Sequence, residues 1–227
     1  IAAMKKAVEG YEGVSVAELQ TKYPQGGEKQ LINAVTGREV PRGGLPIAAG
    51  CIVSNVSTAA ALADAVTTGM PLVRRAVTVT GSVRQPSNLV VPCGTLYTDL
   101  FEACGGFEGE AAKIISGGPM MGLAVADPAI PATKGTSGIT VFSTKDYKPV
   151  VESNCIRCAR CVDACPVGLE PYILNAAALR SNVDVLQAKD ALSCINCGCC
   201  TYVCPAKRDL AQSIALGKKI LAKATKK

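Results

Sequence analysis

The residues of this chain most capable of chemistry are its twelve cysteines. Eight of them form two copies of one pattern: three cysteines separated by two residues each, a fourth after three more residues, and then proline. The two-residue spacing lets one loop direct three sulfurs to the same place, and the longer step carries the fourth sulfur beyond it. This pattern is typical of bacterial proteins that hold two 4Fe–4S clusters. The first copy contains Cys155, Cys158, Cys161 and Cys165, and the second contains Cys194, Cys197, Cys200 and Cys204.

The fourth cysteine of each copy ligates the cluster of the other copy in that pattern. The sequence therefore predicts a crosswise exchange of ligands. Each cluster accepts one electron at a time, so the pair would form a short path for single electrons and perform no bond chemistry itself. We assign one cluster to Cys155, Cys158, Cys161 and Cys204, and the other to Cys194, Cys197, Cys200 and Cys165.

Two other uses of clustered cysteines are less favoured by the sequence. Disulfides need an oxidising compartment, whereas no export signal is visible and such close cysteines could not join distant segments. Zinc also binds thiolates, but zinc modules use pairs of Cys-x2-Cys motifs rather than triplets followed by Cys-Pro. We therefore expect iron–sulfur ligation in a reducing cytoplasm.

The remaining four cysteines do not share the repeated spacing. Cys199 adjoins the ligand Cys200 but is out of register, so we expect a packed thiol there. Cys51, Cys93 and Cys104 are isolated in the sequence, and we expect them in the hydrophobic core.

Other residue types also recur around the two motifs. An isoleucine follows the first cysteine of each copy, Ile156 and Ile195, where an apolar side chain would limit access of solvent. Basic residues flank the motifs as well, and they are either plain solvated charges or groups that offset cluster charge or face an acidic redox partner. These basic residues are Arg157, Arg160, Lys207 and Arg208.

Three compositions follow one another along the chain and predict three domains, at residues 1–72, 73–145 and 146–227. In the first, residues 57–69 have a helical pattern, with Asn55 or Ser57 able to cap its start and Gly69 its end. Small and β-branched residues within 45–56 predict a buried strand before this helix, as in a parallel α/β unit.

The second domain is predicted to be a small β-rich unit with one helix. Alternating β-branched residues in 74–83 predict a strand, and residues 88–106 predict a strand, a turn and a short helix that ends at glycine. Residues 112–122 and 138–144 supply later strands. The third domain is predicted to be helical, with helices in 171–181, 182–192 and 209–224. The apolar face of the last helix consists of Leu210, Ile214, Ile220 and Leu221.

Composition and charge exclude several classes of function. The chain is 48% hydrophobic, so it can bury a core, yet no window approaches the ~18 apolar residues of a membrane span. Its formal charge of +6 is concentrated in a lysine-rich end, and aromatic residues make up only 4%. Two clusters of about −2 each would lower the charge to roughly +2. We therefore predict no nucleic-acid partner.

The order of several stretches resembles the C subunit of the Rnf electron-transport complex over essentially the whole chain. The stretches are KYPQGGEKQLINAVTGREVPRGGLP, CIVSNVSTAAALADAV and GGPMMG, followed by the paired cysteine motifs. The resemblance implies a multidomain protein of mixed α/β and α+β class. It would contain the C-terminal part of a complex-I-like FMN/NADH-binding α/β domain, an SLBB β-grasp domain and a helical ferredoxin-like domain with two 4Fe–4S clusters.

The first segment also resembles the flavin-carrying subunit of respiratory complex I. A Tyr-x-x-Gly-Glu-Glu-x-x-Leu stretch there shapes the FMN and nicotinamide pocket. YPQGGEKQL matches it at Tyr23, Gly26, Glu28 and Leu31, with Gly27 at the first Glu. An Asn-Asn-Val-Glu-Thr stretch contacts FMN, and SNVST matches it at Asn55 and Thr58. Among the matched residues, the resemblance implies cofactor binding by Tyr23, Gly26, Glu28, Asn55 and Thr58.

The glycine-rich loop that binds flavin phosphate in both families is absent from this sequence. Gly26–Gly27 and Gly43–Gly44 are isolated pairs, which we expect in turns. Residue 1 is therefore expected to lie inside the flavin domain, and FMN is expected in a longer, complete protein.

The resemblance implies an electron-transfer subunit of an ion-translocating ferredoxin:NAD⁺ oxidoreductase. Electrons would pass singly through the two clusters to or from FMN, which exchanges hydride with NAD(H), coupled in the complex to Na⁺ or H⁺ translocation. The implied partners are other Rnf subunits, including a ferredoxin-like subunit and integral membrane subunits. The implied location is peripheral, on the cytoplasmic side of the bacterial inner membrane.

Two alternatives share these modules. A cobalamin reductase of bacterial microcompartments is built from the same flavin, SLBB and double-cluster parts. The chain could also act as an electron relay without catalysis of its own.

Overall fold

The computed structural model describes residues 1–225. Within it the chain divides into two compact units, Ile1–Val53 and Ser54–Lys227. No helix among the described residues is both long and apolar enough to cross a membrane.

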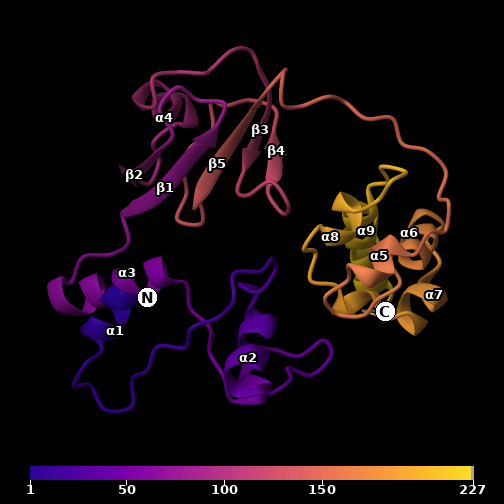
Figure 1. Cartoon of the computed structure of the whole chain (residues 1–227), viewed down its shortest axis with the longest axis horizontal. Coiled ribbons are helices and arrows are strands. Elements are labelled where there is room, and N and C mark those ends of the chain that lie inside the picture. The colour runs from indigo at the N-terminus through magenta and orange to yellow at the C-terminus, as the bar shows by residue number, and fades with distance from the viewer. Residues whose placement is uncertain (226–227) are drawn as a thin grey trace. The chain divides into compact units, whose positions relative to one another are not determined.

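The first unit contains short helices joined by long irregular segments (Figure 1). They are α1 (Ala2–Ala7), α2 (Glu28–Thr36) and the 3₁₀ helix η1 (Pro46–Ala49). The two glycine pairs form turns as predicted: the amide of Gly27 donates to the Pro24 carbonyl at 2.8 Å, and that of Gly44 to the Pro41 carbonyl at 2.9 Å.

The strand predicted within residues 45–56 is wrong. This segment forms η1 and an irregular stretch, and Ile52 is 82% exposed. A buried parallel strand needs neighbouring strands on its edges, and residues 1–53 contain none. Pro46 starts η1, and Gly50 ends it with a left-handed φ of 68°, so the local sequence also interrupts an extended chain.

The helix that follows is confirmed as α3 (Val56–Thr68). Of the two predicted caps, Asn55 is the one used, because its side chain accepts a hydrogen bond from the Ser57 amide at 3.0 Å. Gly69 ends the helix in the left-handed conformation, as predicted.

The predicted β-rich unit is a mixed five-stranded sheet with one helix. Its strand order is β2-β1-β5-β3-β4, and only β1 and β5 pair in parallel. A hairpin, then a helix, then a parallel pairing of the first and last strands is the β-grasp arrangement. The elements are β1 (Arg74–Gly81), β2 (Ser87–Pro92), α4 (Tyr97–Ala103), β3 (Ala111–Ser116), β4 (Leu123–Val125) and β5 (Gly138–Ser143).

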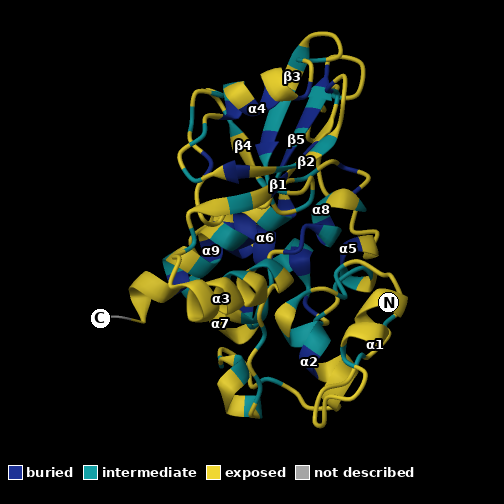
Figure 2. Cartoon of the chain, turned by 90° about the vertical axis from the view of Figure 1, so that its left-hand side faces the viewer, coloured by how far each residue is buried: buried dark blue, intermediate teal, exposed yellow. Residues whose placement is uncertain are grey.

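One hydrophobic core joins the sheet to α4. Val77 and Val79 alternate inward along β1 and belong to one buried cluster with Leu100 and Phe101 of α4. Figure 2 shows buried segments, in dark blue, among the strands and in α4. Cys104 is fully buried in this core, as predicted, whereas Cys51 and Cys93 are only half-buried, so the prediction for those two is wrong. Their neighbouring segments are irregular or near a strand end, where little side-chain packing surrounds them.

The cysteine-rich region is helical, as predicted. Its longest helix, α9, packs against α6 and α7. Gly217 of α9 makes this close approach possible, because a Cβ there would lie 2.9 Å from Leu186 and 3.0 Å from Ala178. The elements are α5 (Arg160–Asp163), α6 (Pro171–Leu179), α7 (Val183–Ala188), η2 (Ala191–Ser193), α8 (Cys199–Tyr202) and α9 (Leu210–Ala224). On the predicted apolar face of α9, Leu210, Ile214 and Leu221 are buried and Ile220 is half-buried.

Candidate iron–sulfur site

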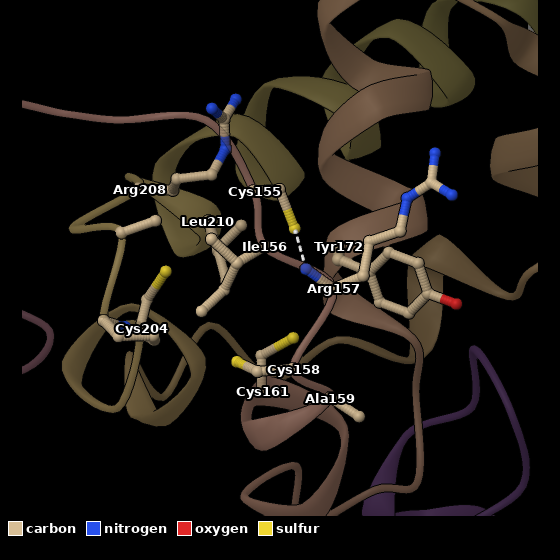
Figure 3. Close-up of a pocket in the computed structure, with 12 residues that line it drawn as sticks. Cys155, Ile156, Arg157, Cys158, Ala159, Cys161, Tyr172, Cys204, Arg208 and Leu210 are labelled. Carbon is tan, nitrogen blue, oxygen red and sulfur yellow. Dashed lines mark hydrogen bonds between the residues drawn. The ribbon is translucent and has the colours of Figure 1, made fainter.

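A first cavity forms where the loop before α5 meets the end of α8. Cys155 and Cys158 come from the loop, Cys161 from α5, and Cys204 from the residues after α8 (Figure 3). The lining also includes Ile156 and Leu210. These are the four cysteines that the sequence assigned to one cluster, and the structure brings them together although up to 49 residues separate them.

A second cavity is lined by the other four motif cysteines. Cys194, Cys197 and Cys200 line it together with Cys165 from the first copy of the motif. Ile195 and Ile214 contribute apolar surface. The predicted exchange of one cysteine between the two copies therefore matches the way the chain folds, while ligation itself remains a prediction.

The backbone of the two motifs repeats as closely as their sequences do. Arg157 and Asn196 both have φ of 54°, and Ala159 and Gly198 follow at 60° and 82°. Left-handed residues between the cysteines turn successive N–H groups toward one side, which is a common way to surround an anionic cluster. The amide of Arg157 lies 3.4 Å from the Cys155 sulfur, and the amide of Asn196 lies 3.4 Å from the Cys194 sulfur.

Burial shapes the acidity of several cavity thiols. Desolvation raises the pKa of Cys161 in the first cavity and of Cys194 in the second. In the second cavity it also raises the pKa of Cys200 to about 12, and neighbouring thiols contribute to that shift. These thiols are neutral near pH 7 without a bound cation, so ligation of iron must release their protons.

The donor set fits a cluster better than a single ion. Among residues 1–225, no three Cys, Asp or Glu side chains converge closely enough to hold one metal ion. Zinc ligands lie at about 2.3 Å from one metal, which requires tightly convergent sulfurs. A 4Fe–4S cluster places each cysteine on a different iron and so accepts more widely spaced sulfurs. The four motif thiols around each cavity therefore suit this cluster.

A polar network surrounds Arg208, which lies in the wall of the first cavity. Arg208 donates to the Asn175 side-chain oxygen at 3.2 and 3.3 Å and to the Ser153 carbonyl at 3.1 Å. Asn175 in turn donates to Ser213 at 2.6 Å, and Glu152 lies 3.2 Å from the arginine. The network ties the chain just before Cys155 to α6 and α9.

At the second motif, a lysine contacts the loop that contains the cysteines. Lys218 of α9 donates to the Cys194 carbonyl at 2.6 Å, and its charge lowers the pKa of that thiol against the larger effect of burial. Sequence reasoning missed this residue because it counted Lys218 within the lysine-rich end. It also missed Asn175, although an asparagine in the apolar stretch of α6 is a detectable signal.

The five candidate flavin-binding residues lie near the starts of two helices. Tyr23 and Gly26 precede α2, and Glu28 is its first residue. Asn55 caps α3, and Thr58 lies in its first turn. Because the two groups belong to different compact units, their convergence on one flavin remains a prediction.

Comparison with known families assigns a known type to each part of the chain. Residues 1–64 match the Nuo51 FMN-binding domain, residues 76–124 the SLBB domain, and residues 148–205 the 4Fe-4S dicluster domain. The chain is thus of the class of redox protein that joins part of an FMN-binding domain to an SLBB domain and a dicluster ferredoxin domain. This agrees with the predicted fold class, while the predicted boundaries at residues 72 and 145 remain predictions.

Curated relatives give the family. The C subunit of the proton-translocating ferredoxin:NAD(+) oxidoreductase complex of Clostridium ljungdahlii is 52% identical over 176 residues, 77% of this chain and 38% of that protein. The C subunit of the Na(+)-translocating complex of Acetobacterium woodii is 43% identical over 220 residues, 96% of this chain and 50% of that protein. The chain belongs to the family of Rnf C subunits. It spans about half the length, or less, of these relatives.

Proposed function

We propose that this chain passes single electrons through two 4Fe–4S clusters within an ion-translocating ferredoxin:NAD⁺ oxidoreductase. The observation that supports this most directly is the crosswise grouping of eight cysteines into two cavities, each with four motif thiols. The formation of the two sites is coupled, because neither cavity has four motif cysteines without one from the other copy of the motif.

The proposed ligands are Cys155, Cys158, Cys161 and Cys204 for one cluster, and Cys165, Cys194, Cys197 and Cys200 for the other. The bound clusters would supply one-electron oxidation and reduction. The backbone amides of Arg157, Asn196 and Leu169 would donate to ligand sulfurs and so favour the more negative, reduced state. Ile156 and Ile195 line the cavities and would restrict water.

The flavin end of the path rests on the match to the FMN-binding domain. FMN would supply the exchange between the two-electron hydride of NAD(H) and single electrons. We propose that Tyr23, Gly26, Glu28, Asn55 and Thr58 bind this flavin and its nicotinamide partner. The relatives' names support ferredoxin and NAD⁺ as the donor and acceptor, and coupling to Na⁺ or H⁺ translocation.

The partners follow from membership of a multi-subunit complex. We propose a ferredoxin-like subunit as the electron partner of the clusters, and integral membrane subunits as the anchor. The proposed location is the cytoplasmic side of the bacterial inner membrane.

The cluster proposal is tested by isolating the chain without oxygen and measuring iron, sulfide and low-temperature EPR after reduction. The expected result is about eight irons per chain and two magnetically coupled signals. A folded, colourless protein that takes up no iron on reconstitution would overturn the proposal.

The flavin proposal has its own test. A longer protein that spans the full length of a related C subunit should bleach its flavin and develop cluster EPR signals on addition of NADH. Flavin reduction without cluster reduction would contradict the proposed path, while absence of both would contradict the activity. Removal of the Asn55 side chain, in Asn55→Ala, should weaken FMN retention, with Asn88→Ala in the β-grasp unit as the control.

A further inference from the structure

The second cavity contains one thiol more than a 4Fe–4S cluster needs. Five cysteines line it, namely the four proposed ligands and Cys199, whereas the described lining of the first cavity has four. Cys199 is half-buried at the wall of the cavity rather than packed in the core, so the expectation of a merely packed thiol is incomplete.

The extra sulfur lies beside a particular ligand. Cys199 and Cys197 both line the second cavity, and a hydrogen bond joins their side chains. An iron bound by Cys197 would therefore have a second sulfur within a short displacement. Cys200, the next ligand, adjoins Cys199 in sequence but follows it on α8.

The first motif supplies a natural comparison at the same position. Cys199 is the first residue of α8, and Arg160 is the first residue of α5. Each follows a left-handed residue, Gly198 or Ala159, and each precedes the third cysteine of its motif. The backbone conformation before Arg160 and before Cys199 is therefore the same, but only the second motif has a sulfur at this position.

We propose that Cys199 is a reserve ligand, able to bind the iron of the second cluster that Cys197 normally holds. This inference rests on the proposed clusters. In the exchange, the Fe–S bond to Cys197 breaks and one to Cys199 forms, the Cys199 proton passes to the released Cys197 thiolate, and no oxidation state changes. In a variant without Cys197, that proton goes to solvent. The second cluster would thus survive loss of a ligand that the first cluster could not survive.

The test compares matched alanine variants of the whole chain, reconstituted without oxygen. Cys197→Ala should retain about eight irons per chain, whereas Cys158→Ala, the same position of the first motif, should retain about four. Cys197→Ala with Cys199→Ala should also fall to about four, and Cys199→Ala alone should keep about eight. The EPR signal of the second cluster should be altered in Cys197→Ala, because its ligand sulfur has moved.

Equal iron contents in Cys197→Ala and in the Cys197→Ala, Cys199→Ala double variant would overturn the proposal. Loss of iron from Cys199→Ala alone would also overturn it, since Cys199 would then be a primary ligand. Should the double variant not fold, the decision passes to Cys158→Ala with and without Arg160→Cys. If Arg160→Cys restores the iron lost in Cys158→Ala, the proposal is supported. If Arg160→Cys does not restore it, the proposal is overturned. An iron content of about eight in wild type shows separately that the proposed clusters form.

Discussion

The two cysteine cavities have the same backbone plan but different surroundings. In the first, Cys155 and Cys158 are exposed, and Arg208 lies in the cavity wall and holds the loop through the Ser153 carbonyl. In the second, Cys197 and Cys200 are buried, and Lys218 contacts the loop through a carbonyl. The repeat therefore specifies where the sulfurs lie, while the residues around it give each site its own electrostatics and access to solvent.

This difference suggests unequal roles in electron transfer. A site with exposed cysteines suits exchange with a separate partner, whereas the second site, whose four proposed ligands are all buried or half-buried, is better shielded from solvent. Four sets of substitutions test whether the two sites differ in this way.

Paired cysteine substitutions should have the largest effect. Cys155→Ala with Cys204→Ala removes two proposed ligands of one cluster, so about four irons per chain should remain. Cys155→Ala with Cys194→Ala affects both clusters, so almost no iron should remain. Iron and sulfide analysis separates the two outcomes. If the first pair lost as much iron as the second, the crosswise assignment would be wrong.

Removal of Arg208 should weaken the first site. Arg208→Met leaves the Asn175 oxygen and the Ser153 carbonyl without this donor, and should lower the free energy of unfolding by about 1–3 kcal/mol. Denaturant unfolding under anaerobic conditions measures the change. Lys207→Met is the matched control, because Lys207 is exposed and adjacent. A similar loss in both variants would indicate a general effect of charge.

Removal of the lysine charge should act on the second site. Lys218→Met takes a positive charge from beside the Cys194 loop, which makes the reduced cluster less favourable. Its reduction potential should fall by on the order of tens of millivolts, and that of the first cluster by less. Redox titration followed by EPR gives both values. Lys219→Met, on an exposed position of α9, should leave both potentials near wild type, and equal shifts in both clusters would contradict the assignment.

The smallest effect is expected from the backbone itself. Ala159 has a left-handed φ of 60° where the second motif has Gly198, so Ala159→Gly should relieve strain and stabilise the chain by less than about 1 kcal/mol. Ala164→Gly, at a right-handed helix end, should instead destabilise by about 0.5–1 kcal/mol. Thermal unfolding of the two variants compares them directly. A destabilising Ala159→Gly would show that strain at this position is negligible.

Where local sequence carries strong signals, the predicted elements are confirmed. Strands β1, β2, β3 and β5 and helices α3, α6, α7 and α9 lie where periodicity, caps and glycine place them, whereas β4 lies outside the predicted segments. The strand predicted within 45–56 fails because small and β-branched residues indicate a strand only if other strands are present to pair with it, and the described unit has none.

The sequence by itself predicted the ligand set, because the spacing of cysteines within one loop sets which sulfurs can converge on one cluster. It also determined the family and the helical character of the cysteine-rich region. Only the tertiary structure decided which side chains surround each cavity. Arg208, Asn175 and Lys218 act through partners 24 to 55 residues away, and Cys199 meets the cavity only because α8 turns it there. Contacts of that kind depend on how helices pack, which no local pattern encodes.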